Sequence, residues 1–271
     1  MSNASTKTSG GFPNPLHWIG VGVLATCQEL GRLTIFASQV KFAAFTPRWF
    51  GGAILRQMVS IGFYSLPVVG LSAIFIGAAL ALNIYSGGSR FGAEQFVPTI
   101  VVLGITRELG AVITGLMLAG RVSAGISAEV GAMRVTEQID ALKTLSANPF
   151  RYLYAPRFLA ALVTLPILVL LADIIGVMGG WLVSTQALGF DSTVYLRNTL
   201  DFVTTEDVVV GLIKAVVFGG VIAIMGCYHG ANSKAGATGV GRAATLSMVS
   251  AAVLVLALNY VMSTLFESIG L

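Results

Sequence analysis

The stretch from Ile105 to Arg157 reads ITRELGAVITGLMLAGRVSAGISAEVGAMRVTEQIDALKTLSANPFRYLYAPR, and it decides the fold. Its first half is an apolar run that contains the adjacent residues Arg107 and Glu108, and its second half is charged and amphipathic. Ionisable groups at membrane depth are costly, so they mark a pathway, a bound ligand or a structural pair. A polar helix between two spans offers a docking surface for a cytoplasmic protein. The stretch therefore predicts a transport protein whose motor is a separate polypeptide.

The composition places the chain in a bilayer. Hydrophobic residues make up 55% of the 271 residues, charged residues make up 10%, and the mean hydropathy is +0.85. Because a soluble domain has roughly a quarter of its residues charged, the predicted fold class is an all-α integral membrane protein. The net charge of +4 fits cytoplasmic loops near anionic lipid headgroups, so no nucleic-acid partner is expected.

The hydropathy pattern predicts a flexible tail at 1–11 and a single domain at 12–270. Apolar and charged residues mix along 12–45, which is typical of an amphipathic helix lying along the cytoplasmic interface. An acidic loop is expected at 189–207, and Pro67 predicts a kink in the first span. The five predicted spans cover about 58–85, 96–126, 157–188, 208–228 and 243–266.

The basic residues predict the orientation of these spans. The connection after the second predicted span and the connection after the fourth carry most of the positive charge, which places both in the cytoplasm. An odd number of spans without an internal repeat argues against inverted repeats, so a homodimer would supply the symmetry. The lack of an Arg/Ser-rich transit peptide favours the bacterial inner membrane over a chloroplast envelope.

The charges inside the spans leave two interpretations open. Arg107 and Glu108 point about 100° apart on a helix, so they need not pair with each other. Either one of them faces a cavity or a gate, or both form structural ion pairs with Arg56, Asp173 or Lys214. Asp173 lies near the middle of its span and the long Lys214 side chain reaches far, which favours a structural pair between these two.

The charged segment after the second span predicts a coupling helix that docks a partner. At helical spacing, Met133 and Leu142 would fill a groove while Glu129, Glu137 and Asp140 contact its rim. The alternative is an ordinary solvated helix. The candidate coupling residues are Glu129, Met133, Arg134, Thr136, Glu137, Gln138, Asp140 and Leu142.

No constellation in the sequence predicts an enzyme. A phosphate-binding loop of the form G-x-x-x-x-G-K-[ST] is absent, so any ATP hydrolysis belongs to a separate subunit. His17 and His229 are far apart and no Cys/His cluster has metal-ligand spacing, so we expect neither a metal site nor a cofactor in this chain.

The run RELGAVITGLMLAGRVSAGISAEVGAMRVTEQIDAL resembles the permease family of the Mla, Mce-associated and chloroplast TGD lipid ABC transporters, the MlaE family. Asn148-Pro149, Ala155-Pro156-Arg157, Leu165-Pro166, Gly179-Gly180 and the segment 236–242 fit the same pattern in the same order. The resemblance covers nearly all of the chain after the tail. One departure is Ala111, where the family often has proline, so a softer kink is expected there.

This resemblance implies a homodimer of five-span subunits that moves phospholipid for outer-membrane lipid homeostasis. Two cytoplasmic ATPase subunits that bind Mg-ATP would grip the coupling helix. An MCE-domain protein would lie on the outer side, and some systems add a STAS-domain protein. Lipid would occupy a cavity at the dimer interface, lined by the first, second and fifth spans. Its candidate contacts in this chain are Arg56, Arg107, Glu108, Leu109 and Arg242.

Two other functions compete with this one. An ion-gradient-driven transporter of lipid or small molecules would use Arg107, Glu108 and Asp173, and it would work without a nucleotide-binding subunit. A membrane scaffold would translocate nothing, so substitutions at Glu108 or Leu109 would leave the lipid distribution unchanged.

Overall fold

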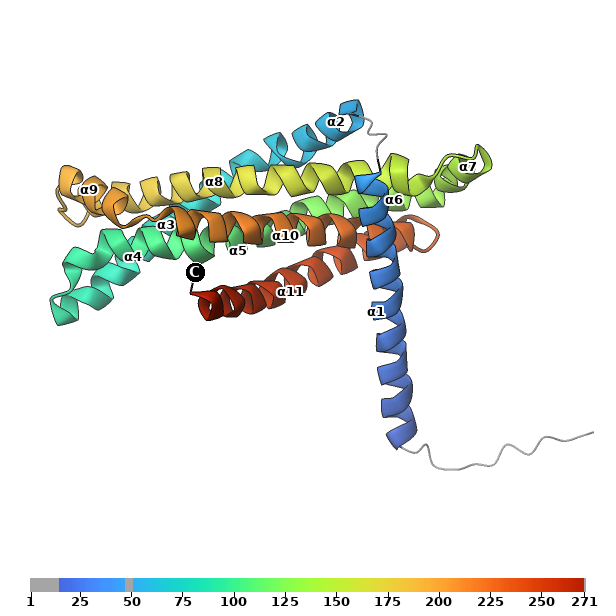
Figure 1. Cartoon of the computed structure of the whole chain (residues 1–271), viewed down its shortest axis with the longest axis horizontal. Helices are drawn as coiled ribbons and strands as arrows, with labels where there is room; N and C mark the ends of the chain where they lie inside the picture. The colour runs from blue at the N-terminus through green and yellow to red at the C-terminus, as the bar shows by residue number, and fades with distance from the viewer. Residues whose placement is uncertain (1–14, 47–50, 271) are drawn as a thin grey trace, which may run out of the picture. The chain divides into compact units, whose positions relative to one another are not determined.

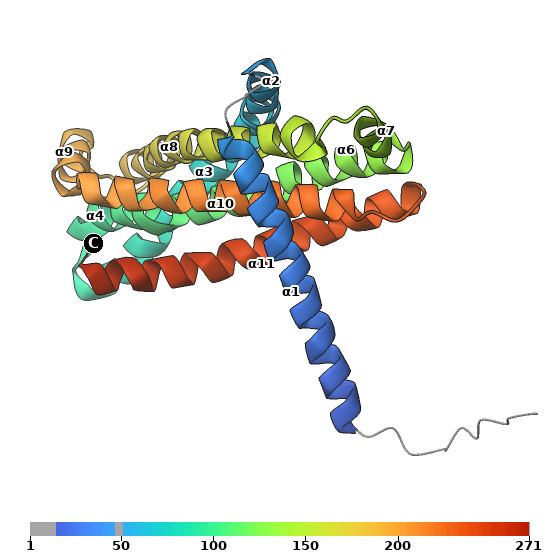
Figure 2. The same cartoon turned by 45° about the vertical axis from the view of Figure 1, so that its right-hand side comes forward.

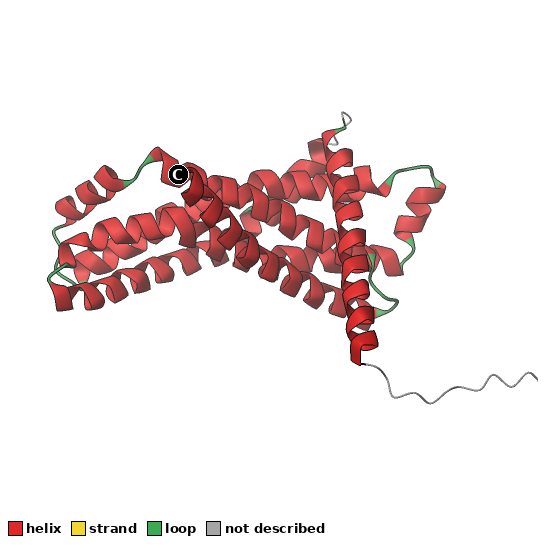
Figure 3. Ribbon diagram, turned by 60° about the horizontal axis from the view of Figure 1, so that its bottom comes forward, coloured by secondary structure: helices red, strands yellow, loops and turns green. Residues whose placement is uncertain are grey.

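The computed structural model describes residues 15–46 and 51–270. The described residues are helical apart from short turns, and they divide into two units, Met1–Gln39 and Val40–Leu271 (Figure 3). The helix α1 (Pro15–Phe45) covers the described part of the first unit and continues into the second. It confirms that most of 12–45 is helical; its interfacial position stays a prediction, and the predicted tail at 1–11 lies outside the described residues.

Five helical segments in the second unit are long and apolar enough to cross a membrane, so the chain is an all-α multi-pass membrane protein. These segments lie side by side as a bundle in both Figure 1 and Figure 2. They cover Gly51–Phe91, Glu94–Val135, Phe150–Gln186, Thr205–Ala231 and Ala237–Ile269. Each predicted span falls almost wholly within one of them, and each segment extends beyond its prediction at one or both ends.

The first segment divides into α2 (Gly51–Ile61), a short 3₁₀ turn at Phe63–Ser65, and α3 (Leu66–Gly88). Pro67 stands in the first turn of α3, where a missing backbone N–H costs nothing because that N–H has no partner within the helix. The predicted kink at Pro67 inside one span is therefore corrected to a boundary between two helices.

Two π-helical turns interrupt the second segment. The order is α4 (Val97–Gly104), a π-helix at Ile105–Leu109, α5 (Gly110–Leu118), a second π-helix at Ala119–Ser123, and α6 (Ala124–Val135). A π-turn accommodates an extra residue and re-aims the side chains around it, and such turns are frequent at functional sites. The first π-helix contains both Arg107 and Glu108.

The predicted coupling helix is two helices rather than one. After α6 ends at Val135, Glu137 adopts a left-handed backbone with φ of 59°, and α7 (Gln138–Thr144) starts in a new direction. A left-handed residue cannot continue a right-handed α-helix. The single helical face that was expected to join Met133 to Asp140 is therefore wrong.

The third span is α8 (Ala155–Gln186), which follows a π-helix at Phe150–Tyr154. The acidic loop predicted at 189–207 contains α9 (Ser192–Phe202) instead, because the Asp191 carboxylate accepts hydrogen bonds from the backbone N–H groups of Thr193 and Val194. The last two spans are α10 (Thr205–Ala231) and α11 (Ala237–Ile269). In the bundle, α7 and α9 lie at opposite ends (Figures 1 and 2).

Close backbone contact joins α3 to α8. A Cβ added to Gly77 would overlap the carbonyl oxygen of Gly176 and would stand 2.7 Å from the carbonyl carbon of that residue. Small residues let transmembrane helices approach until their backbones touch, and dispersion then holds them together. This contact fixes α8 against α3 at the level of the first π-helix, where Gly176 also contacts Ile105.

Candidate functional site

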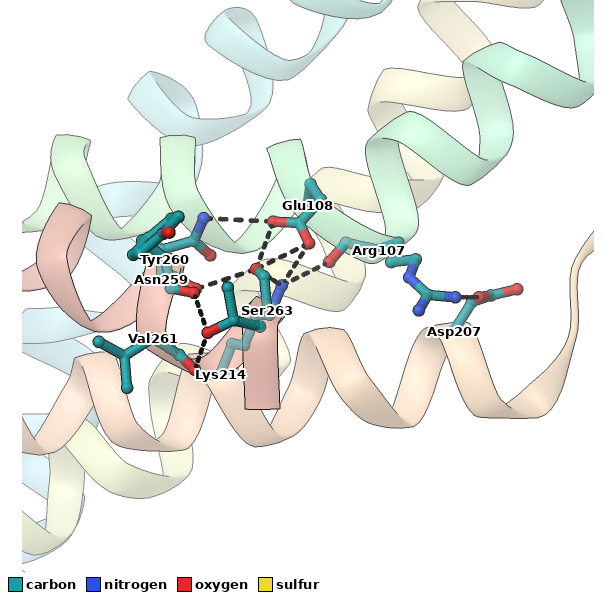
Figure 4. A network of polar contacts seen from close by, with 9 residues as sticks. Arg107, Glu108, Asp207, Lys214, Asn259, Tyr260, Val261 and Ser263 are labelled. Atoms are coloured by element: carbon teal, nitrogen blue, oxygen red, sulfur yellow. Dashed lines mark hydrogen bonds and ion pairs between the residues drawn. The ribbon is translucent and has the colours of Figure 1, made fainter. Parts of the chain in front are cut away.

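The first π-helix directs Glu108 into a polar network at the centre of the bundle. The Lys214 ammonium on α10 donates to Glu108 Oε1 at 2.7 Å, and Ser263 on α11 donates to the same carboxylate at 2.9 Å. Asn259 Nδ2 donates to Glu108 Oε2 at 3.2 Å. Figure 4 shows the Glu108 and Lys214 side chains converging, with Ser263 beside them. Three helical segments therefore meet at one carboxylate.

Lys214 is fully buried, and its ammonium has three acceptors. Besides Glu108, these are the Arg107 backbone oxygen at 3.2 Å and the Ser263 hydroxyl at 2.9 Å. An ammonium removed from water is tolerated only when it is paired and its donors are satisfied. The Glu108 side chain is 38% exposed, so the pair has one sheltered partner and one accessible partner.

Arg107 points away from Glu108 and pairs with Asp207 at the start of α10, at 3.2 Å (Figure 4). Asp207 is held by a capping box, in which its N–H donates to Thr204 Oγ1 at 3.3 Å and its carboxylate accepts from the Thr204 backbone N–H at 3.4 Å. The Thr204 hydroxyl also donates to this carboxylate, at 2.7 Å. Asp207 and Lys214 are seven residues apart on α10 and so lie on one face. The two neighbours thus bind different partners, in line with the expectation that they need not pair with each other.

The predicted pair between Asp173 and Lys214 is wrong, because Lys214 binds Glu108. Asp173 is 6% exposed on α8, and its Oδ1 has no hydrogen-bond partner among the described residues. Its carboxyl group packs against Gly110, where an added Cβ would stand 2.9 Å from the Asp173 Cγ. The Glu108–Lys214 pair is one of the structural ion pairs that the sequence leaves open, and the π-helix brings the two groups together.

Asn259 and Ser263 belong to the network but are not among the site residues predicted from the sequence. They are four residues apart on α11 and therefore lie on one face of an otherwise apolar span. Two polar side chains at this spacing inside a membrane segment indicate a polar contact with a neighbouring helix, since such residues hydrogen-bond across helices.

A narrow apolar pocket of about 20 Å³ lies beside the network. Leu109 lines it directly after Glu108, so one turn of the π-helix contributes to both the polar network and the apolar wall. Other walls come from α3, α5 and α8. The lining residues are Val69, Ser72, Ala73, Ile76, Gly77, Ile105, Leu109, Gly110, Ile113, Thr114, Met117, Ala172 and Gly176.

The remaining cavity candidates lie apart from this site. Arg56 lines a separate surface groove on α2, together with Leu55 and Tyr64. Arg242 is exposed near the start of α11. Neither side chain joins the Glu108 network, so their predicted contact with lipid remains a prediction.

The predicted coupling residues separate into a salt-bridged surface and an apolar groove. Asp140 accepts from Lys143 and Arg134 at 2.9 Å each, and the hydrogen bond from Lys143 lowers the pKa of Asp140 below its ordinary value. Thr136 and Glu137 are exposed at the break between α6 and α7. The groove is lined by Met133, Gln138, Ile139, Ala141, Leu142, Leu145 and Leu153.

Glu129 has a structural role that was not expected. Its carboxylate accepts from Arg157 Nη2 at 3.0 Å, and Arg157 is 5% exposed and also donates to the Leu153 backbone oxygen. Removing one partner of such a pair leaves the other charge uncompensated. Glu129 therefore joins α6 to the start of α8, and the accessible acidic group at the break is Glu137. Among the described residues, no group of three or more His, Cys, Asp or Glu side chains is placed to hold a metal ion.

Comparisons with known proteins converge on one family of membrane proteins. The family model described as "Permease MlaE" matches residues 54–265. A probable ABC transporter permease protein from Rickettsia prowazekii is 49% identical over 92% of this chain and 96% of its own length. An intermembrane phospholipid transport system permease protein, MlaE of Haemophilus influenzae, is 33% identical over 80% of this chain and 84% of its own length. The chloroplastic Arabidopsis thaliana protein TRIGALACTOSYLDIACYLGLYCEROL 1 is 31% identical over 94% of this chain and 70% of its own length.

Proposed function

We propose, because this chain belongs to the MlaE permease family, that it is the membrane-spanning subunit of an ATP-driven ABC transporter of phospholipids. The observation that carries the proposal is the apolar pocket at Leu109 beside the accessible edge of the Glu108–Lys214 pair. A phospholipid needs an apolar surface for its tails and a few polar groups for its headgroup. The π-helix provides both on adjacent residues.

Two copies of the chain would complete the lipid cavity. Among the five membrane segments, α11 and the segment that contains α3 are the least buried. Their exposed apolar side chains include Phe75 on α3 and Tyr260 on α11. These faces are available to lipid and to a second copy, and both helices border the polar network or the pocket. A homodimer would therefore place two such sites against each other.

ATP binding by a separate ATPase would drive the cycle from the α7 end. The groove beside α7 has a volume of about 330 Å³ and apolar walls, and the exposed Glu137 directly precedes its lining residue Gln138. A partner seated there would move α6, which is continuous with the π-helices and α5. Closure of two docking sites would squeeze the cavity and expel the lipid.

The remaining partners and the location follow from the same proposal. The chain would reside in the bacterial inner membrane, with the α7 end in the cytoplasm and the α9 end outside. An MCE-domain protein would exchange lipid at the α9 end, for outer-membrane lipid homeostasis. A STAS-domain protein would bind the ATPase in systems that contain one. No cofactor is needed in this chain, because the ATPase binds Mg-ATP.

Reversing the charge of the docking surface should separate the chain from its ATPase. We expect the Glu137→Lys/Asp140→Lys variant to lose most co-purifying ATPase, because like charges across an interface are strongly unfavourable. The matched control is Asp201→Lys, an exposed acidic residue on α9 at the opposite end. The amount of ATPase recovered in a pull-down with each variant measures this loss of binding. Normal recovery with the double variant would refute the docking role of α7.

A photocrosslinker at Leu109 tests the lipid site. We expect mass spectrometry of the purified complex to find phospholipid attached at position 109. The matched control is Val101, which is fully buried in a cluster with Ala81 and Val97, so a crosslinker there should capture protein only. Equal capture of lipid at both positions, or none at Leu109, would contradict the assignment of the pocket.

A further inference from the structure

Asp173 is a buried ionisable group that the proposed transport mechanism does not use. It lies in the middle of α8 with 6% of its surface exposed, and Oδ1 has no hydrogen-bond partner among the described residues. Its carboxyl group faces the junction between the first π-helix and α5, where Gly110 leaves room for it. Gly110 and Ala172 also line the apolar pocket, so Asp173 stands directly behind the pocket wall.

The charged groups near Asp173 are already committed to other partners. On the π-helix, Arg107 pairs with Asp207 and Glu108 pairs with Lys214; on α10, Lys214 has three acceptors. Neither α3 nor α5 contributes a charged side chain at this level.

Further ionisable groups lie on α8 and on the elements packed against it, and Glu206 at the start of α10 is exposed. At the α9 end, Tyr195 contacts α8 near Gly180, and at the α7 end Gly62 contacts it near Thr164. The groups are Arg56, Tyr85, Arg151, Tyr152, Tyr154, Arg157, Tyr195, Arg197, Asp201, Glu206, Cys227, Tyr228 and His229.

An isolated carboxylate in such surroundings is far more costly than a neutral carboxylic acid. Transfer of an unpaired ion into an apolar interior carries so large a penalty that the group takes up a proton instead. The protonated group also gains an O–H donor, whereas a carboxylate can only accept. The carbonyl oxygen of Ile105, in the π-helix, is close by. It would lie 3.0 Å from a Cβ added to Gly110, and the Asp173 carboxyl group fills the space of that Cβ.

We propose that Asp173 is a proton-binding site, in which the neutral acid keeps α8 packed on the junction between the π-helix and α5. The bound ligand is a single proton, taken up on a carboxylate oxygen and returned to solvent when the group ionises. Ionisation would draw water or a cation toward Gly110, two residues from Glu108. The packing of the lipid pocket and the position of Glu108 would then depend on pH.

The sign of the pH dependence follows from linkage. The folded protein would hold a proton at Asp173 at pH values where the unfolded chain has released it. Stability therefore falls as pH rises above the ordinary titration range of aspartate, and this loss continues until the folded site itself ionises. An Asp173→Asn variant keeps the shape and the neutral charge, so it should lack this contribution.

Two measurements on the full-length protein in nanodiscs test the proposal. In infrared spectra of the protein labelled with ¹³C-carboxyl aspartate, we expect a protonated-carboxyl stretch at neutral pH that Asp173→Asn removes. The midpoint temperature of thermal unfolding should fall by several degrees between about pH 6 and about pH 9 in the wild type. In Asp173→Asn it should fall much less. Asp201→Asn, at an exposed position, is the matched control and should change neither result.

The contrary outcomes are distinct. Absence of a protonated-carboxyl band in the labelled wild type would overturn the proposal, even if Asp173→Asn failed to fold. A pH profile of Asp173→Asn that parallels the wild type would overturn it as well. Both readouts are independent of lipid binding and of ATPase assembly. A contrary result in either one would therefore reject the role of Asp173 and leave the proposed transport function standing.

Discussion

Replacing Lys214 by methionine is expected to lower the free energy of unfolding by about 3 kcal/mol, the lower end of the range for removing one partner of a buried ion pair. The lower end applies because Glu108 keeps the donors Ser263 and Asn259 and is partly exposed. The variant should also lose lipid transport, because Glu108, which directly precedes the pocket residue Leu109, is no longer held in place. Denaturation in nanodiscs and a transport assay measure the two effects.

Two further variants isolate the ion pair. Lys143→Met removes a lysine from an exposed pair with Asp140, and it should cost no more than about 1 kcal/mol. The double variant Glu108→Gln/Lys214→Met removes both charges and should recover much of the stability that Lys214→Met loses. If Lys214→Met were no more harmful than Lys143→Met, the network would not be a structural centre of the bundle.

Replacing Gly77 by alanine is expected to destabilise the bundle by about 3 kcal/mol, the upper end of the usual cost of overpacking. The new methyl group would overlap the backbone of Gly176, and a backbone cannot rotate away as a side chain can. The helices α3 and α8 would have to separate, which disturbs the pocket that Gly77 and Gly176 both line. Unfolding in nanodiscs and the yield of folded protein measure this effect.

Gly70→Ala is the matched control, because Gly70 lies on the same helix and faces the same neighbour. Its added Cβ would stand 3.6 Å from Ile175 Cδ1, an ordinary van der Waals contact. Alanine is a better helix former than glycine by about 1 kcal/mol, so this variant should be neutral or more stable. Similar behaviour of the two variants would mean that the close contact between α3 and α8 does not govern stability.

The five spans could be predicted because apolar runs of this length have one stable conformation in a bilayer. Every backbone polar group must be satisfied within the segment, which selects helices. Pro67 predicts a kink but stands at a helix start, because proline is compatible with both. The helix α9 is harder to predict although Asp191 is a good N-cap, since the acidic composition of 189–207 is typical of a loop.

The partners of the intramembrane charges could not be read from spacing alone. The sequence indicates that Arg107, Glu108, Asp173 and Lys214 lie at membrane depth, but pairing depends on helix rotation. A π-turn changes that rotation, and no residue type in Ile105–Leu109 specifies one. The left-handed backbone at Glu137 also has no signal in the sequence, because neither glycine nor proline stands at the break between α6 and α7. Both features depend on tertiary contacts that a single sequence does not show.

The most direct test of the proposed function is phospholipid transfer by proteoliposomes that contain this chain with its ATPase subunit. We predict that labelled phospholipid moves only when ATP is hydrolysed, and that Lys214→Met abolishes this movement. Arg197→Met, which removes a cation from an exposed pair on α9, should leave it unchanged. Transfer by the chain alone, driven by a pH gradient without any ATPase, would contradict the account and favour an ion-driven transporter.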